Sequence, residues 1–310
     1  MEQSKTNYRV SGHESFACRY SWLPKVAYHL RRDDSLLSDE SRAMVELGVG
    51  KNMVRSVRFW AQSAGIVVNE GRSGRHSLTQ FATALLGDRG LDPYLEDIRT
   101  LWLMHWKLAT NIDAPLLAWD YLINNWHEPE MTPTTVIAAL RKETTKQGDN
   151  LSVSTITQHF DTFLHTYVPT KSRKGEILED NLDCPLVELE FIAQRAESKS
   201  AGLKGRREPI YAFNRDRKPE ISPEVFLYSL NSFWHSRHSH EETLSLREVA
   251  HGHGSPGQVF KLPEDDVRAR LEELNRDPSG PFSYAESVNL QQARREKLSG
   301  EAELLKQIYR

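Results

Sequence analysis

The tightest grouping of residues that could do chemistry lies near the start of the chain, in the segment SGHESF (residues 11–16) followed by Arg19. His13 could act as a general base, and Glu14 could bind a metal ion or move a proton. Arg19 could hold a phosphate through two parallel hydrogen bonds. These residue types suit phosphodiester cleavage. In a structural alternative, Glu14 favours a helix start through the helix dipole and His13 is a hydrogen-bonded cap.

A second acidic group precedes Cys184 and consists of Glu179, Asp180 and Asp183. Carboxylate oxygens are the ligands that divalent cations such as Mg²⁺ prefer, so this group could hold one together with Glu14. An exposed acidic turn is the alternative. The expected cofactor is Mg²⁺. No nucleotide cofactor is expected, because neither GxxxxGK[ST] nor GxGxxG occurs.

Residues 42–79 predict the element that would place DNA beside such a site. Gly48 and Gly50 interrupt an apolar periodicity with a turn, and a second helix is expected to begin at Lys51. Its apolar positions recur at spacings of three and four, which leaves a polar, cationic face for a groove. That face carries Lys51, Asn52, Arg55 and Arg58. The pattern is typical of a helix-turn-helix.

A short β-branched run follows this helix and leads into a glycine-bearing hairpin that carries Arg72, Arg75 and His76. Between Arg42 and His76 the sequence has six Lys or Arg against two Asp or Glu. A basic wing beside a basic helix favours contact with duplex DNA. Winged helices also serve as protein-interaction modules, and that alternative stays open.

A third basic stretch lies between Arg195 and Lys218, with eight Lys or Arg against three acids. Its low apolar content predicts a mobile loop, with Lys204, Arg206 and Arg207 as phosphate-contacting residues. A domain linker is the alternative interpretation.

The remaining elements are predicted to be helical. Aromatic helices are expected over 91–127, a helix from Pro133 after a Thr132 cap, and another over Ser152–Tyr167. The helix from Pro133, a polar turn at Lys146–Asn150 and the helix over 152–167 together form a second helix-turn-helix candidate that core packing also explains. Toward the C-terminus, helices and a strand near Phe282 suggest a third winged-helix pattern, followed by an amphipathic helix over Gln291–Tyr309.

The predicted fold class is therefore mainly α with short β-wings and several winged-helix or helix-turn-helix modules. Three domains are expected: an N-terminal winged-helix DNA-binding domain (1–110), a helical middle domain (111–195), and a basic loop with a winged-helix-like domain (196–310). At 310 residues the chain is long enough for several cores.

Composition limits the class of protein. The net charge of −3 argues against a coat that binds every duplex by charge alone. No apolar run is long enough to cross a bilayer, and two distant cysteines provide neither a disulfide framework nor a four-cysteine zinc site. A cytoplasmic protein without membrane contact is expected.

Several separated motifs resemble one bacterial family. They are GHESFACRYSWLPK, LGVGKNMVRSVRFWAQSAGIV, LLGDRGLDPYLEDIRTLWLMHW, EDNLDCPLVEL and SPGQVFKL. In this order they resemble the SspB-like DNA nickase family of the Ssp DNA phosphorothioation system, a defence against phage. The resemblance implies DNA nicking as part of sulfur modification. It also implies partner subunits: a cysteine desulfurase, an ATP-pyrophosphatase-like protein and an ATPase.

Three functions follow from these observations. The first is a DNA-nicking endonuclease of phosphorothioate modification, with double-stranded DNA as its substrate. The second is a noncatalytic DNA-binding subunit or transcriptional regulator that recruits the modification enzymes, and the third is a winged-helix scaffold for partner proteins. A homodimer is one oligomeric state that the sequence leaves open.

Overall fold

The structure is a computed structural model of the 310-residue chain. It describes residues 6–71, 74–169, 184–199, 207–287, 290–297 and 299–310, with the backbone alone at 196–199. The chain forms two compact units. Unit 1 comprises Met1–Leu122 and Trp126–Asn214, and unit 2 comprises Ile123–Asn125 and Arg215–Arg310. The predicted domain boundaries near 110 and 195 both fall inside unit 1.

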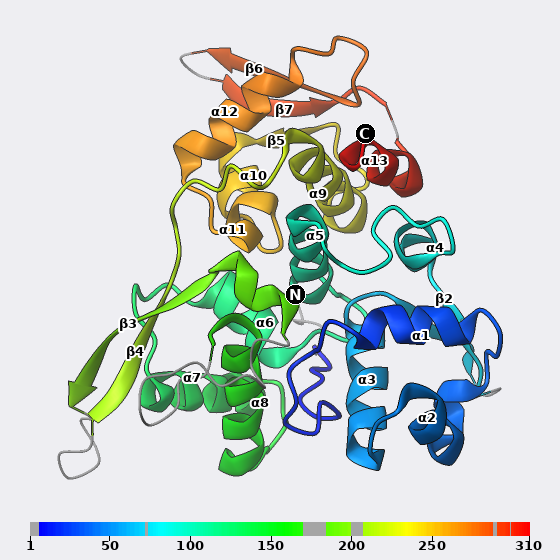
Figure 1. The fold of residues 1–310 in the computed structure, drawn as a ribbon. Coiled ribbons are helices and arrows are strands. Elements are labelled where there is room, and N and C mark those ends of the chain that lie inside the picture. Colours follow the sequence, from blue (N-terminus) through cyan, green and yellow to red (C-terminus); the bar gives the residue numbers. More distant parts are fainter. Residues whose placement is uncertain (1–5, 72–73, 170–183, 200–206, 288–289, 298) are drawn as a thin grey trace. The chain divides into compact units, whose positions relative to one another are not determined.

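Unit 1 is mainly helical (Figure 1). Its α-helices are α1 (Trp22–Leu30), α2 (Glu40–Leu47), α3 (Lys51–Ser63), α4 (Gln80–Leu86), α5 (Ile98–Ala109), α6 (Leu117–Asp120), α7 (Pro133–Lys146) and α8 (Val153–Tyr167). Short 3-10 turns occur at η1 (Leu36–Ser38) and η5 (Pro185–Leu189), and a π-helical turn, η3 (Tyr121–Asn125), crosses from unit 1 into the first segment of unit 2.

The strands of unit 1 form two antiparallel hairpins. One pairs β1 (Val67–Asn69) with β2 (His76–Leu78), and the other pairs β3 (Ile192–Lys199) with β4 (Arg207–Phe213). The mobile loop predicted over 195–218 is therefore wrong at residues 195–199 and 207–213, which belong to strands. Backbone pairing between Met131 and Tyr211 fixes β4 to the rest of unit 1.

Local signals explain why several helices begin where they do. Thr132 forms a capping box with Thr135 and is followed by proline, which suits the first helical position, so α7 begins at the predicted residue. Ser152 caps α8 by accepting a hydrogen bond from the Thr155 amide. Aromatic side chains from α5, α6 and α8 fill the core of unit 1, as predicted for residues 91–127. The fully buried ones include Trp102, Trp106, Trp119, Phe160, Phe163 and Tyr167.

Unit 2 combines helices with one three-stranded antiparallel sheet (Figure 1). Its helices are α9 (Pro223–Arg237), α10 (Leu246–His251), α11 (Pro256–Phe260), α12 (Glu264–Leu274) and α13 (Glu301–Ile308), and its strands are β5 (Thr243–Ser245), β6 (Phe282–Ser287) and β7 (Leu290–Arg295). The central strand is β7. The predicted helix over 291–309 is thus wrong in its first part, because β7 pairs with both β5 and β6.

The fold class is confirmed at the level of a mainly α protein with short β elements. The winged-helix assignments remain predictions. No helix in the described ranges is long and apolar enough to span a membrane.

Candidate nucleic-acid interface

The turn between α2 and α3 forms where the two glycines predicted it. Gly48 ends α2 in the left-handed conformation with φ 66°, which glycine adopts without strain. Gly50 precedes α3 as its N-cap. The apolar face of α3 is buried, whereas Lys51 and Asn52 are exposed at its start. The first turn of α3 contains no acidic residue and its N-cap makes no side-chain hydrogen bond, so this end of the helix presents positive potential.

Two cations of α3 converge on one carboxylate of α2. The Nε atom of Arg55 lies 2.8 Å from Oε1 of Glu40, and Nζ of Lys51 lies 3.6 Å from Oε2 of the same residue. The hydrogen bond from Arg55 lowers the pKa of Glu40, and the bond to Glu40 raises the pKa of Arg55. Glu40 is therefore an intramolecular counter-ion for two of the predicted DNA-binding residues.

Arg58 points back toward the segment before α2. Its Nη1 atom donates to the carbonyl oxygen of Leu37 at 3.2 Å, and its charge lowers the pKa of His76, after the larger effect of burial. Arg58 is half-buried, and among the described residues its hydrogen bond goes to Leu37, whereas Lys51 and Arg55 pair with Glu40.

The β1–β2 hairpin exposes one of its predicted basic residues and buries another. The Arg75 side chain is 62% exposed, and its Nε lies 3.7 Å from Oδ2 of Asp34. The His76 side chain is only 3% exposed, and its Nδ1 lies 3.4 Å from the Ser38 hydroxyl. His76 begins a strand whose inward position it occupies, so its ring packs in unit 1 and does not lie beside Arg75 on the surface. Arg72 lies outside the described residues.

Of the third basic group, only Arg207 is described. It is exposed at the first position of β4, and Lys204 and Arg206 lie outside the described residues.

The segment Gly12–Phe16 is a tight loop whose backbone is unusual. Gly12, Glu14 and Ser15 all have positive φ, at 104°, 49° and 64°. A non-glycine residue in this region is uncommon and needs support from its surroundings. Gln158 of α8 supplies part of it by donating a hydrogen bond to the Ser15 hydroxyl.

His13 supplies the rest, because its ring lies in the interior against α8. It is 2% exposed, and its Nε2 lies 3.3 Å from Nδ1 of His159, which is itself fully buried. Burial lowers the pKa of both rings, that of His159 to about 3, so both are neutral.

A hydrogen-bond partner assigns the tautomer of His159. The Ala118 amide donates to Nε2 of His159 at 3.1 Å, which leaves the hydrogen of that ring on Nδ1, facing Nε2 of His13. The other ring nitrogen of His13, Nδ1, has two neighbours. The Ser15 amide donates to it at 3.1 Å, and the Thr162 hydroxyl lies 3.1 Å away. That hydroxyl also donates to the Gln158 carbonyl and so links the His13 ring to α8.

This arrangement places the His13 ring inside unit 1, and its predicted role of general base stays a prediction. Both of its ring nitrogens have partners inside unit 1, and the ring does not reach the surface. Glu14, the next residue, is half-buried, and its charge contributes to the raised pKa of Arg55, after the larger effect of Glu40. The fold thus brings Glu14 near the cationic face of α3. Arg19 is half-buried, with its Cζ 5.6 Å from the centroid of the Trp22 ring.

A metal cage is not formed by the described residues. Among them, no group of three or more His, Cys, Asp or Glu side chains could hold a metal ion. Glu14 therefore provides a single carboxylate there. The predicted ligands Glu179, Asp180 and Asp183 lie outside the described residues. The described residues do not fit a protein-built Mg²⁺ site.

Sequence reasoning missed three residues that shape this region. Glu40 is separated by 15 positions from Arg55, and His159 and Thr162 lie 146 and 149 positions from His13. No spacing rule connects residues so far apart. A buried-face histidine at 159, within the apolar periodicity of α8, was the one available signal.

Comparisons with known proteins give a likeness over nearly the whole chain. A crystal structure of SspB matches with a TM-score of 0.81 and 24% identity, covering 98% of this chain and 89% of that one. A crystal structure of magnesium-ion-bound SspB matches with a TM-score of 0.79 and 23% identity, covering 98% and 90%. No curated protein matches the chain.

The chain thus has the SspB fold, which confirms the resemblance carried by its sequence motifs at the level of fold. The family model matches residues 10–309 and is described as a protein of unknown function, DUF4007. The chain belongs to the DUF4007 family.

Proposed function

We propose that this protein binds duplex DNA and nicks it, as an SspB-like component of DNA phosphorothioate modification. The observation that carries the proposal is the whole-chain likeness to SspB, at a TM-score of 0.79 to 0.81 over 98% of the chain. The motifs that resemble SspB-like DNA nickases are spread along the chain in the same way. The proposed partners are the desulfurase, the ATP-pyrophosphatase-like protein and the ATPase of that system.

The DNA-binding surface is proposed to be the start of α3 and the exposed hairpin side chain Arg75. Lys51 and Asn52 are exposed beside a helix N-terminus that lacks acidic residues. Such an end favours a phosphate through its backbone N–H groups and its dipole. Arg75, exposed on the hairpin, would contact the backbone on the other side of the groove.

The nicking reaction is assigned to the loop that carries Glu14. In the proposed step, the oxygen of a water molecule attacks the phosphorus atom while the Glu14 carboxylate takes one proton from that water. One phosphorus–oxygen ester bond breaks, and the leaving sugar oxygen takes a proton from the solvent. Arg55, whose pKa already responds to Glu14, would stabilise the charge on the phosphate. In this proposal the buried His13 ring supports the Gly12–Phe16 loop from the interior of unit 1 and takes no part in proton transfer.

A plasmid assay tests this proposal. Purified protein is incubated with supercoiled plasmid, with Mg²⁺ or with EDTA, and conversion to open circle is measured by gel. Glu14→Gln keeps the size of the side chain and removes its charge, so we expect nicking to fall by at least about a hundredfold, the usual contribution of an acid–base group. Duplex affinity and unfolding temperature should change little.

Three other results would assign the function differently. Tight duplex binding by the wild type without any nicking would support the noncatalytic DNA-binding subunit. Normal nicking by Glu14→Gln would remove Glu14 from the reaction and direct the test to Glu179, Asp180 and Asp183. A wild type that binds no duplex contradicts the proposal as a whole.

A further inference from the structure

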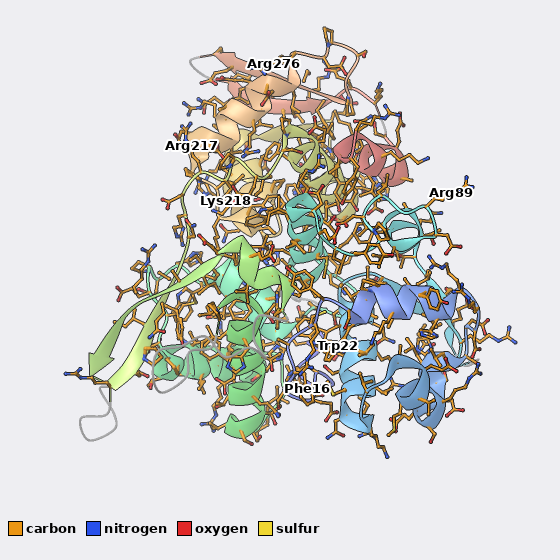
Figure 2. All side chains as sticks on the ribbon, in the orientation of Figure 1. Phe16, Trp22, Arg89, Arg217, Lys218 and Arg276 are labelled. Atoms are coloured by element: carbon orange, nitrogen blue, oxygen red, sulfur yellow. The ribbon has the colours of Figure 1, made fainter. Side chains whose placement is uncertain are left out.

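A cavity of about 650 Å³ lies beside the α2–α3 turn, within unit 1. It is formed by the start of α1 with the residues before it, the end of α2, and the turn itself (Figure 2 labels Trp22). The lining residues that matter for its chemistry are Arg19, Lys25, Met44, Val45, Val49 and Met53. The volume is in the range of pockets that hold a ligand or a few side chains of a partner.

Aliphatic and thioether side chains dominate the part of this cavity that reaches the surface. Val45 is 80% exposed and Met44 is 37% exposed, although both lie on a helix whose opposite face is fully buried. Met53 and Val49 continue the same lining. Methionine adapts its shape to different apolar partners, so this lining suits an apolar side chain from another molecule.

The charged groups of the lining are all positive. Arg19 and Lys25 line the cavity, and its described lining includes no Asp or Glu. Lys25 is exposed, and its ammonium donates to the Leu47 carbonyl at 3.3 Å, which uses one of its three N–H groups. The Tyr20 hydroxyl donates to Glu188. An occupant that fits the lining therefore carries both an apolar group and a negative charge.

We infer that this cavity docks an acidic protein segment in which a large apolar side chain lies within a few residues of a carboxylate. The apolar side chain packs on Met44, Val45 and Met53, and the carboxylate pairs with Lys25. A DNA backbone would meet the cations but would leave these apolar side chains against charged oxygens. The occupant is therefore a protein and not the duplex. Its anchor residues Val45 and Lys25 are not among the DNA contacts proposed above, whereas Met53 lies in the same first turn of α3 as those contacts.

A peptide-display selection on the full-length protein identifies a probe. Random twelve-residue peptides are selected on the wild type, with counter-selection on Val45→Glu, a change at an exposed helical position. We expect the enriched sequences to combine Leu, Ile, Phe or Met with nearby Asp or Glu. The enriched peptide is then synthesised with a fluorescent label, and its binding is measured by anisotropy.

Charge exchange decides whether that peptide uses this cavity. Val45→Glu and Lys25→Glu should each weaken binding about tenfold or more, as loss of an anchor contact does. Replacing the acidic residues of the peptide with lysine should restore binding to Lys25→Glu and abolish it for the wild type. The matched controls Val153→Glu and Lys142→Glu change exposed residues of α8 and α7 outside the cavity, and both should bind the original peptide normally.

Each other outcome contradicts the inference. No enrichment, or enrichment of basic peptides, means that the lining does not select this chemistry. Displacement of the peptide by a 20-base-pair duplex, with Val45→Glu inert, would make the cavity part of the DNA surface. Plasmid nicking by Val45→Glu and Lys25→Glu is measured alongside, so loss of peptide binding with nicking retained separates this site from the proposed DNA function.

Discussion

Glu40 is a single residue that controls the cations proposed to meet DNA. While Arg55 and Lys51 pair with its carboxylate, a phosphate must compete for them. The pair is partly exposed, so it contributes little to stability and is open to exchange. Glu40 would then lower the affinity of the protein for duplex DNA of any sequence.

Removing that carboxylate should strengthen DNA binding. We expect Glu40→Gln to raise duplex affinity by roughly threefold to thirtyfold at low salt, because two cations lose their internal partner. The gain should shrink as salt is raised. Fluorescence anisotropy with a labelled duplex measures it, and Glu46→Gln, on the same helix but paired with His29, is the control. An unchanged affinity would show that Arg55 and Lys51 do not meet DNA.

The buried histidine pair makes a prediction about acid. His159 has a folded pKa of about 3, lowered by burial from an ordinary value of 6.5. Between pH 3 and pH 6.5 the unfolded chain binds a proton on His159 that the folded chain does not bind. The free energy of unfolding therefore falls as the pH falls from 6.5 toward 3. His13, with a pKa also lowered by burial, acts in the same direction. Protonating either ring would also place two N–H groups face to face.

Urea unfolding from pH 7 to pH 3.5 measures this effect. In the wild type, His159 should contribute a slope of up to about 1.4 kcal/mol per pH unit. His159→Gln retains a donor and an acceptor but does not titrate, so its curve should be flatter. The exposed His240→Gln should keep the wild-type slope. Equal slopes for all three proteins would contradict the buried, neutral state of His159.

At the scale of elements, the α2–α3 turn depends on the left-handed backbone of Gly48. A Cβ atom there would meet nothing within 4 Å, so any cost of substitution is conformational and not steric crowding. We expect Gly48→Ala to lower the free energy of unfolding by about 1 kcal/mol, because alanine disfavours positive φ. Asparagine tolerates this conformation, so Gly48→Asn should lose less. Urea denaturation compares the three proteins, and equal losses for alanine and asparagine would contradict the prediction.

Elements defined by local signals could be predicted, and those defined by pairing could not. Gly48 with Gly50, and Thr132 with Pro133, specify a turn and a helix start through their own backbone preferences. Residues 291–295 look polar and helical, yet β7 forms because β5 and β6 lie on both sides of it. Charge-rich residues at 192–199 form β3 for the same reason, through β4.

The candidate site divides in the same way. Lys51 and Asn52 were predictable as an exposed face because helical spacing places them there. The burial of His13 and His76 was not, since it depends on α8 and on the segment before α2, which are distant in sequence. Histidine suits both a surface and a satisfied interior, so residue type alone does not decide between them.

At the scale of the molecule, unit 2 is built around a short insertion from an earlier part of the chain. The backbone amide of Gly254 donates to the side-chain oxygen of Asn124 at 2.8 Å. The side-chain amide of Gln258 donates to the backbone carbonyl of Ile123 at 2.8 Å. The buried side-chain nitrogen of Lys261 donates to the same carbonyl. Three residues of unit 2, Gly254, Gln258 and Lys261, therefore hold residues 123–125 through hydrogen bonds.

Lys261 makes this region sensitive to pH. Burial lowers its pKa from 10.5 to about 7, so between these values the unfolded chain binds a proton that the folded chain does not hold. Stability should therefore rise as pH increases from 7 to 10, by up to about 1.4 kcal/mol per pH unit. Lys261→Met keeps a straight side chain and should flatten that rise, whereas the exposed Lys306→Met should not. Thermal unfolding across this pH range measures the difference, and a parallel rise in all three proteins would contradict it.

The insertion of residues 123–125 also limits which parts of the coding sequence can recombine with another gene and still give a folded protein. A recombination event that transfers the coding sequence from residue 215 onward would carry most of unit 2 but leave Ile123 and Asn124 behind. In the transplanted piece, the Gly254 amide would lack the Asn124 side chain and the Lys261 side chain would lack the Ile123 carbonyl, and burying groups that lose a hydrogen bond lowers stability. Such a chimera would fold poorly unless its new host supplied a matching turn. The two units are therefore expected to be inherited together.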